Sequence, residues 1–139
     1  MNNELVIIRG IPGSAKSTLA KTYIAKGYKH FEADMFFMID GEYKFDIKKI
    51  GEAHLDCQYK TKDALQEGYN VVVSNTNTTL KEVNRYINIA KDVDVPFRII
   101  HCKGEFKNVH NVPEDVLQKM KDRMVNIEGE EYYYPIVKD

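Results

Sequence analysis

The sequence predicts an α/β fold with a parallel sheet flanked by helices, and three features lead to this prediction. Short apolar runs alternate with longer helical patterns along the 139 residues. The run Leu5-Val6-Ile7-Ile8 leads directly into a glycine-containing turn and the start of a helix. Val71-Val72-Val73 is an uninterrupted β-branched run, which is typical of a strand covered on both faces. Together these features indicate strand–helix–strand crossover units.

Four strands and four helices are expected in alternation. The strands should cover residues 5–9, 29–33, 71–73 and 97–102, and the helices residues 17–26, 47–67, 79–91 and 113–126. Asp46 can cap the second helix and Gly68 can close it. Thr79 and Glu82 form a capping-box pattern at the start of the third helix. Pro113 lies in the first turn of the fourth helix, where a proline is tolerated.

Composition narrows the class of protein. With 43% hydrophobic and 29% charged residues, the chain is expected to fold as one domain over residues 1–139 rather than to be disordered. The net charge of −1 gives no overall attraction to nucleic acid. Cys57 and Cys102 stand apart, without the spacing of a metal site. No run resembles a signal peptide or could span a bilayer, so a cytoplasmic protein without membrane contact is expected.

Residues 10–17, which read Gly-Ile-Pro-Gly-Ser-Ala-Lys-Ser, have the pattern of a phosphate-binding loop. Glycines let the backbone curl so that its N–H groups point at an anion, and the helix N-terminus adds its dipole. Lys16 would reach the β- and γ-phosphates and Ser17 would bind Mg²⁺. Ala15 stands where glycine is usual. The predicted nucleotide contacts are Gly10, Ile11, Pro12, Gly13, Ser14, Ala15, Lys16, Ser17, Thr18 and, outside the loop, Arg123.

Polar residues follow the carboxyl ends of the other expected strands, where such sheets bind ligands. Asp34 can accept a proton from an attacking hydroxyl, or it can cap a helix over 35–39; the two roles are compatible. Ser74 stands where an Asp of the Mg²⁺ shell is usual, and its hydroxyl could hold a metal-bound water. Asn75, Thr76 and Asn77 could contact substrate, or they could form a polar turn that caps the next helix.

Two further groups have alternative interpretations. The cationic residues Lys103, Lys107, His101 and His110 could close over a γ-phosphate, or they could form a solvated basic loop. Phe36 and Phe37 could be core packing or a substrate wall, and Phe37 is the predicted substrate contact. The tyrosines at 132–134 lie in the tail over about 127–139. They could stack on bases or pack on the sheet.

Four motifs in order resemble the P-loop kinases of the polynucleotide-kinase type, over roughly residues 4–126. They are Arg9 to Ser17, Asp34-Met35-Phe36-Phe37, Ser74-Asn75-Thr76-Asn77, and Lys107-Asn108-Val109-His110-Asn111-Val112-Pro113. Residues 41–46 and Ala53-His54 are also similar to the family.

The resemblance implies a P-loop NTPase fold: a three-layer sandwich with a four-stranded parallel sheet, in the order 29–33, 71–73, 5–9, 97–102. It implies ATP and Mg²⁺ as cofactors and Asp34 as the general base that activates a 5′-hydroxyl. Lys16 would act on the phosphates. Lys107 would take the place of a lid arginine, in a lid segment over about 102–113 that is short for the family. Ala33 and Phe37 stand where relatives have arginines that hold the substrate's phosphate.

Three functions therefore remain open. The first is ATP-dependent phosphoryl transfer to a hydroxyl, as a kinase for the 5′-OH of a nucleic acid or nucleotide. The second is a kinase of a small metabolite, which the Phe36/Phe37 wall favours. The third is an ATP-binding protein with weak or no catalysis, suggested by Ala15, Ser74 and the short lid segment.

Overall fold

A five-stranded parallel sheet forms the centre of the computed structural model, which describes residues 3–104 and 112–135. The strands are β1 (Leu5–Arg9), β2 (Lys29–Phe31), β5 (Val71–Ser74), β6 (Phe97–Cys102) and β7 (Glu131–Tyr133). They lie in the order β2-β5-β1-β6-β7, and each neighbouring pair is parallel. The first four have the predicted order.

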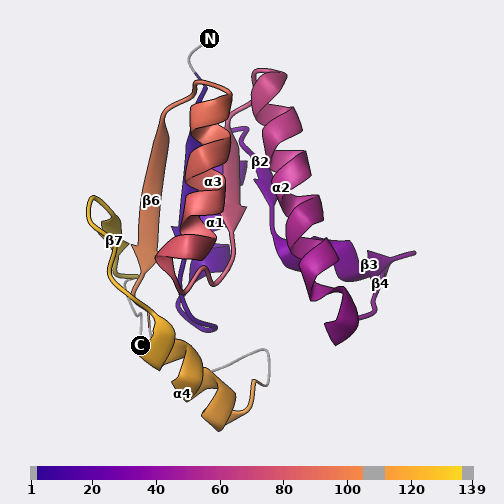
Figure 1. Ribbon diagram of the computed structural model, residues 1–139, viewed down its shortest axis with the longest axis vertical. Coiled ribbons are helices and arrows are strands. Elements are labelled where there is room, and N and C mark those ends of the chain that lie inside the picture. Colours follow the sequence, from indigo (N-terminus) through magenta and orange to yellow (C-terminus); the bar gives the residue numbers. More distant parts are fainter. Residues whose placement is uncertain (1–2, 105–111, 136–139) are drawn as a thin grey trace.

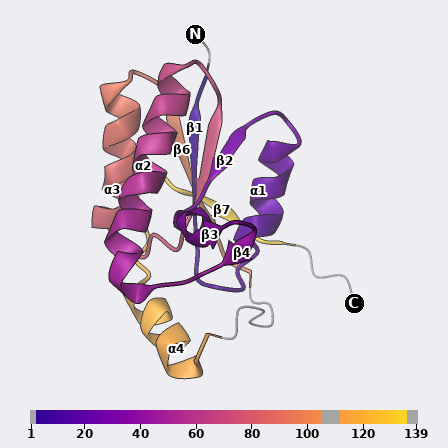
Figure 2. The ribbon, with the colours of Figure 1, turned by 90° about the vertical axis from the view of Figure 1, so that its right-hand side faces the viewer.

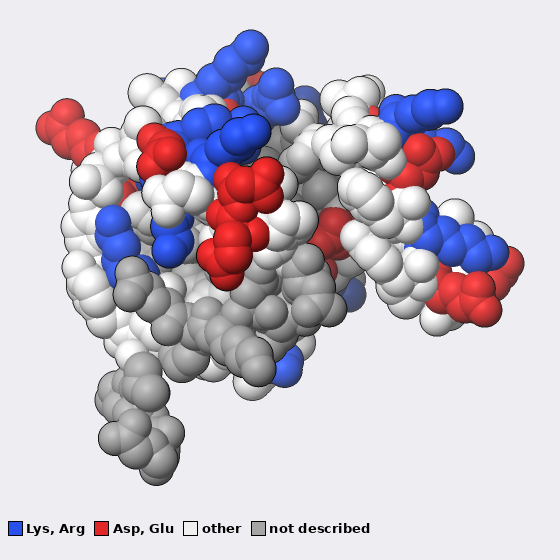
Figure 3. All heavy atoms as spheres, turned by 90° about the horizontal axis from the view of Figure 1, so that it is seen from below, with Lys and Arg blue, Asp and Glu red and all other residues white. Residues whose placement is uncertain are grey.

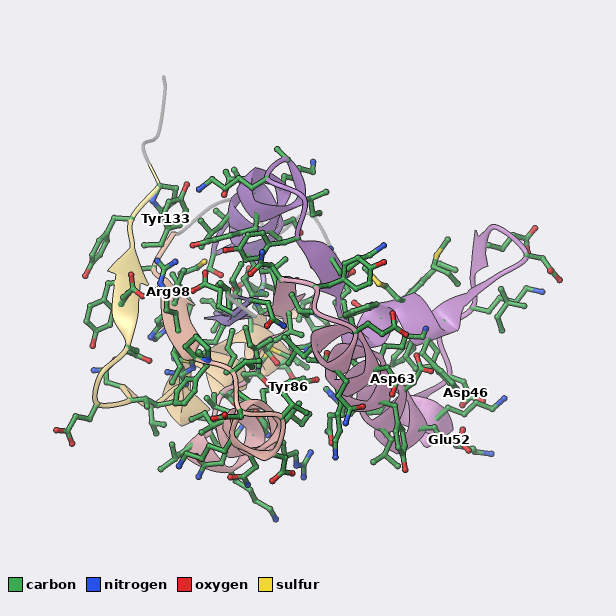
Figure 4. The ribbon with its side chains drawn as sticks, turned by 90° about the horizontal axis from the view of Figure 1, so that it is seen from above. Asp46, Glu52, Asp63, Tyr86, Arg98 and Tyr133 are labelled. Carbon is green, nitrogen blue, oxygen red and sulfur yellow. The ribbon has the colours of Figure 1, made fainter. Side chains whose placement is uncertain are left out.

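The fifth strand corrects the prediction of a four-stranded sheet. β7 pairs with β6 in the register Cys102↔Tyr133, so the tyrosine tail lies on the sheet edge through residues 131–133. The Arg98 guanidinium beside it donates two hydrogen bonds, of 2.9 and 3.0 Å, to the Glu131 carboxylate (Figure 4). A three-residue strand with one charged residue has too short a pattern to be predicted from the sequence.

Four α-helices accompany the sheet: α1 (Lys16–Ile24), α2 (Ile50–Gln66), α3 (Leu80–Asp92) and α4 (Glu114–Arg123). α1 covers one face and α2 with α3 cover the other, which gives the predicted three layers (Figures 1 and 2). α4 lies beyond the sheet at the carboxyl ends of the strands, and none of its residues is buried (Figure 1).

The central strands explain why their sequences are continuously apolar. In β1, Leu5 and Ile7 pack with α2 and α3, while Val6 and Ile8 pack with α1. All four side chains have no exposed surface. Val71, Val72 and Val73 divide between the same two layers. Because both faces are covered, hydrophobic residues occupy every position rather than alternate ones.

Helix starts follow the predicted caps in part. The capping box at α3 is confirmed, since the Thr79 hydroxyl accepts from the Glu82 amide and the Glu82 carboxylate accepts from the Thr79 amide. Asp46, however, caps the short 3₁₀ helix η2 (Ile47–Lys49), and α2 begins only at Ile50. Figure 4 shows Asp46 at this junction, outside the start of α2.

The segment between β2 and η2 folds into a short helix, two residues earlier than the predicted alternative over 35–39, and a hairpin that was not predicted. A 3₁₀ helix, η1 (Ala33–Phe37), is followed by a hairpin of β3 (Met38–Ile39) and β4 (Glu42–Tyr43). Asp40 and Gly41 both have positive φ, 51° and 80°, as the tight turns of hairpins require. Among the described residues, no helix has the length and hydropathy needed to cross a bilayer.

A buried ion pair joins the end of β1 to the C-terminal segment. The Arg9 guanidinium lies 2.7 Å from the Glu130 carboxylate, and neither side chain has any exposed surface. His101 Nδ1 lies 2.9 Å from the other Glu130 oxygen. Burial opposes ionisation of Glu130, but the hydrogen bonds from His101 and Arg9 outweigh it and lower the pKa of Glu130. The pair therefore stays charged at neutral pH.

We expect Glu130→Gln to destabilise the fold by about 3–5 kcal/mol, because it leaves the Arg9 charge buried without a counter-ion. Chemical denaturation followed by circular dichroism measures the loss. Glu131→Gln is the matched control, because it removes the same charge from the next residue. Glu131 forms a solvent-exposed pair with Arg98, and such a pair contributes less than about 1 kcal/mol. Equal losses in the two variants would contradict a special role for the buried pair.

Candidate functional site

The phosphate loop lies between β1 and α1, at the carboxyl end of the central strand. The Gly10 amide donates to the Thr76 carbonyl at 3.2 Å, which ties the loop to the turn after β5. A Cβ on Gly10 would collide with Ser14 Oγ and lie 3.1 Å from the Cys102 carbonyl oxygen. Only glycine therefore fits at the first position of the loop.

Ala15 has φ 75° and ψ 26°, in the left-handed region that favours glycine. The backbone thus keeps the conformation that the usual glycine would take, and the methyl group is accommodated at a cost in strain. As the residue before α1, Ala15 offers no side-chain cap to the helix amides. The first amides of α1 are then suited to hold an anion.

Ser14 Oγ is a second sign of a built site. The side chain is buried, with 1% of its surface exposed, and its hydroxyl has no hydrogen-bond partner within residues 3–104 and 112–135. Buried hydroxyls are normally satisfied. The unpartnered Ser14 hydroxyl is therefore consistent with a loop that binds a ligand.

Lys16 lies over the loop, where its ammonium group donates to the Ile11 carbonyl at 3.0 Å. Burial lowers the pKa of Lys16 to about 8, while the nearby Cys102, Glu32 and Asp34 act in the opposite direction. The Lys16 ammonium group therefore interacts electrostatically with two carboxylates from the segment after β2. Lys16 and Asp34, two of the predicted site residues, are therefore near enough for their charges to interact.

Asp34 lies in η1 with an exposed side chain. Its Oδ1 accepts a hydrogen bond of 3.3 Å from the Tyr43 hydroxyl of β4. The alternative prediction, a helix cap for 35–39, is wrong, because η1 already spans Ala33–Phe37 and Glu32 occupies its cap position. The carboxylate is thus accessible and held from one side.

The turn after β5 mainly supports its surroundings. Asn75 is buried, accepts from the Ala33 amide at 2.9 Å and donates to the Tyr86 hydroxyl at 3.3 Å. It therefore holds η1, the helix that carries Asp34. Thr76 binds Gly10 through its carbonyl, and Asn77, also buried, has a positive φ of 44°. These contacts favour the interpretation of a structured turn over direct substrate contact.

Ser74 contacts two residues that the sequence analysis gave no role. Its hydroxyl lies 2.6 Å from His30 Nε2 and donates to Glu32 Oε2 at 3.3 Å. Glu32 and His30 come from the end of β2, next to β5 in the sheet. An acidic residue two positions before Asp34 was a signal available in the sequence.

Phe37 is 3% exposed and packs with Ala33 and Ala53, which matches the core-packing alternative. It also forms the floor of a groove of about 520 Å³ beside η1. The groove is lined by Phe36, Phe37, Ile39, Lys44, Phe45, Asp46 and Lys49.

The predicted cationic cluster is wrong for His101. That side chain is 3% exposed and faces Glu130, and burial is the main cause of its lowered pKa. Lys103 donates to Asn126 Oδ1 at 3.2 Å and lies over the Tyr132 ring. Arg123 lies on α4, in a shallow groove with Val116 and Met120. Lys107 and His110 fall outside the described residues.

Figure 3 views the face at the carboxyl ends of the strands. Basic and acidic side chains are mixed on it, without a continuous basic surface in this view. Among the described residues, no group of three or more His, Cys, Asp or Glu side chains could hold a metal ion by itself.

We expect Ala15→Gly to raise the free energy of unfolding by about 0.5–1 kcal/mol. Glycine removes the strain of the left-handed backbone at this position, and this gain exceeds the cost of the higher conformational entropy that glycine gives the unfolded chain. Thermal and urea unfolding measure the change. Ala25→Gly is the control: Ala25, at the other end of α1, has a right-handed conformation, so glycine should destabilise there. A loss of stability in both variants would show that Ala15 is not strained.

Comparison with known proteins gives a family match. Residues 5–127 match the family described as AAA domain. The human NEDD4-binding protein 2 is 32% identical over 128 residues, which cover 84% of this chain and 7% of that protein. The bifunctional polynucleotide phosphatase/kinase of Schizosaccharomyces pombe is 26% identical over 136 residues, covering 88% of this chain and 30% of that protein. The chain thus spans 7% of the length of the human protein and 30% of the length of the Schizosaccharomyces pombe protein.

A solved structure supports the fold. A gluconokinase from Sinorhizobium meliloti 1021 superposes with a TM-score of 0.61 at 17% identity, covering 96% of this chain and 82% of that one. At this identity the likeness concerns the fold alone. The match over residues 5–127 shows that the chain belongs to the AAA domain family, and the loop after β1 agrees with this match. The chain is a polynucleotide-kinase-like P-loop domain.

Proposed function

We propose that this protein is an ATP-dependent kinase that transfers the γ-phosphoryl group to the 5′-hydroxyl of a nucleic acid or nucleotide. The observation that carries the proposal is the placement of Lys16 and Asp34. The ammonium group lies in the phosphate loop, within the electrostatic influence of a carboxylate that is exposed to an acceptor. A phosphate-binding group and a proton acceptor at one sheet end are the minimum that phosphoryl transfer needs.

The loop residues fit a nucleoside triphosphate. Gly10 permits the close approach of Ser14 and the Cys102 carbonyl that gives the loop its shape, and the uncapped amides at the start of α1 are available to an anion. Lys16 would pair with the β- and γ-phosphates. The oxygen donors of Ser17 and Ser74 suit Mg²⁺, which prefers oxygen ligands and keeps several waters. When bound, Mg²⁺ would neutralise phosphate charge.

Asp34 would act on the acceptor. The acceptor hydroxyl oxygen forms a bond to the γ-phosphorus, the bond from that phosphorus to the β–γ bridging oxygen breaks, and ADP leaves. The hydroxyl proton passes to the Asp34 carboxylate. Tyr43 donates to one carboxylate oxygen and leaves the other available to the acceptor. We further propose that residues 1–139 act as one unit, with a lid over about 102–113 that contributes Lys107.

The choice of acceptor rests on similarity to the Schizosaccharomyces pombe protein, whose name includes polynucleotide phosphatase/kinase. A small metabolite is the second candidate. The groove beside η1 has aromatic walls at Phe36 and Phe45, and its size of about 520 Å³ suits a small molecule. Ala33 and Phe37, the positions where relatives have phosphate-holding arginines, are buried among apolar side chains.

We expect Asp34→Asn to lower the transfer rate by about 10²–10⁴-fold while ATP binding persists, because the amide cannot accept the proton. Transfer of label from γ-labelled ATP to 5′-OH DNA, 5′-OH RNA, nucleosides and small polyols measures the rate and identifies the acceptor. Asp40→Asn is the matched control, at an exposed hairpin turn. Label on a polyol but not on nucleic acid would favour the metabolite kinase, and no label on any acceptor would refute the kinase proposal.

ATP affinity should fall as the pH rises above about 8. Lys16 has a pKa near that value in the free protein, whereas bound phosphate would raise it, so binding requires uptake of a proton at higher pH. The dissociation constant of a fluorescent ATP analogue should rise by about tenfold per pH unit above pH 8. Lys16→Arg, which stays charged, should give a flat profile from pH 7 to 9. A flat profile in the wild type would contradict this role of Lys16.

A further inference from the structure

The end of β5 lacks the acidic residue that this type of site uses. In P-loop NTPases, Mg²⁺ is held by the loop Ser or Thr and by an Asp of a second motif, whose place the sequence resemblance assigns to Ser74. Here β5 pairs directly with β1 and ends at Ser74, and residues 74–79 contain no carboxylate. A serine hydroxyl carries no charge. The cation would therefore lack its usual negative partner on this strand.

The next strand supplies a carboxylate at the same place. β2 pairs with β5 in the register Phe31↔Val73, so Glu32 follows beside Ser74. Ser74 Oγ donates to Glu32 Oε2 at 3.3 Å, and His30 Nε2 lies 2.6 Å from Ser74 Oγ. With its proton on Nε2, a neutral His30 donates to Ser74, whose own proton points to Glu32. This chain of hydrogen bonds fixes the carboxylate over the end of β5.

Glu32 lies at the same end of the sheet as the phosphate loop, because β2, β5 and β1 are parallel neighbours and Glu32 directly follows β2. The Glu32 side chain is about one-third exposed, at 34%, and remains open to a ligand. A carboxylate so close to the loop would repel the phosphates of a metal-free nucleotide. A divalent cation between them would turn this repulsion into attraction.

We propose that Glu32, fixed through Ser74, is the acidic partner of nucleotide-bound Mg²⁺, a role that the sequence resemblance assigns to the position of Ser74. The inference rests on the proposed function only in assuming that the loop binds Mg²⁺–ATP. The donor set fits this cation, since Ser74 and Glu32 place a hydroxyl and a carboxylate oxygen 3.3 Å apart and Ser17 supplies a further hydroxyl from the start of α1. A purely structural link between β2 and β5 is the alternative.

Glu32→Gln separates the two possibilities through nucleotide binding alone. The dissociation constant of a fluorescent ATP analogue is measured with excess Mg²⁺ and with EDTA, without any acceptor. With Mg²⁺, binding should weaken by about 10- to 100-fold, as is usual when a residue that supports a metal is removed. With EDTA, binding should stay equal or become tighter, because a repulsive charge is gone. A structural link would instead weaken binding under both conditions.

Glu42→Gln provides the matched control, since it removes the same charge from the exposed hairpin. A second variant, Glu32→Gln with Ser74→Asp, returns a carboxylate to β5 and should recover the Mg²⁺ dependence if it keeps the wild-type melting temperature. The single variant decides the question alone. Mg²⁺ dependence equal to that of the wild type, or a wild type that binds equally with and without Mg²⁺, would overturn the inference. Mg²⁺-dependent binding without transfer to any acceptor would refute the kinase proposal and leave Glu32's role standing.

Discussion

The buried charge of Arg9 is the constraint on which the sheet end depends. A guanidinium without solvent contact needs partners for its N–H groups, and its desolvation is offset only by a close counter-ion. Glu130 supplies the charge, and the carbonyls of Asn77, Thr78 and Val125 accept further hydrogen bonds. Arg9 directly precedes Gly10, the first residue of the phosphate loop. Its contacts therefore hold three segments beside the start of the loop: the turn after β5, the chain after α4 and the residue before β7.

The same sheet end concentrates the polar groups of the site. Parallel strands place their carboxyl ends together, so the segments after β1, β2 and β5 meet although they are far apart in the chain. Asn75 links β5 to η1, and Ser74 links β5 to Glu32. Lys16 is half-buried at the start of α1, and this burial lowers its pKa to about 8. The position of Asp34 therefore depends on the turn after β5 as much as on its own helix.

Local patterns predicted the parts of the fold that local physics determines. The apolar runs of β1 and β5 reflect burial on both faces, and the Thr79–Glu82 cap is a contact within one helical turn. The hairpin was missed although Asp40-Gly41 is a strong turn signal, because its strands have only two residues each. Arg9 and Glu130 are 121 residues apart, and β7 pairs with β6, which lies about 30 residues earlier in the chain. One sequence does not reveal either contact. His101 was misassigned for the same reason: its partner Glu130 belongs to that distant segment.

The residues that depart from the family motif differ in how much they change the site, and the backbone structure shows this difference. Ala15 keeps the left-handed conformation of the glycine that it replaces, so that change costs strain but leaves the loop shape intact. Ser74 removes a charge from β5, yet Glu32 stands 3.3 Å from its hydroxyl on the adjacent strand. The charge that a motif residue would supply can therefore come from a residue on the neighbouring strand. The electrostatic energy of a ligand depends on the position of a charge and not on the strand that carries it. Ala33 and Phe37 differ in kind, because both are buried and pack with Ala53 in an apolar cluster. Under the proposed function, the residues that would bind the nucleotide therefore match the motif more fully than those that would contact the acceptor.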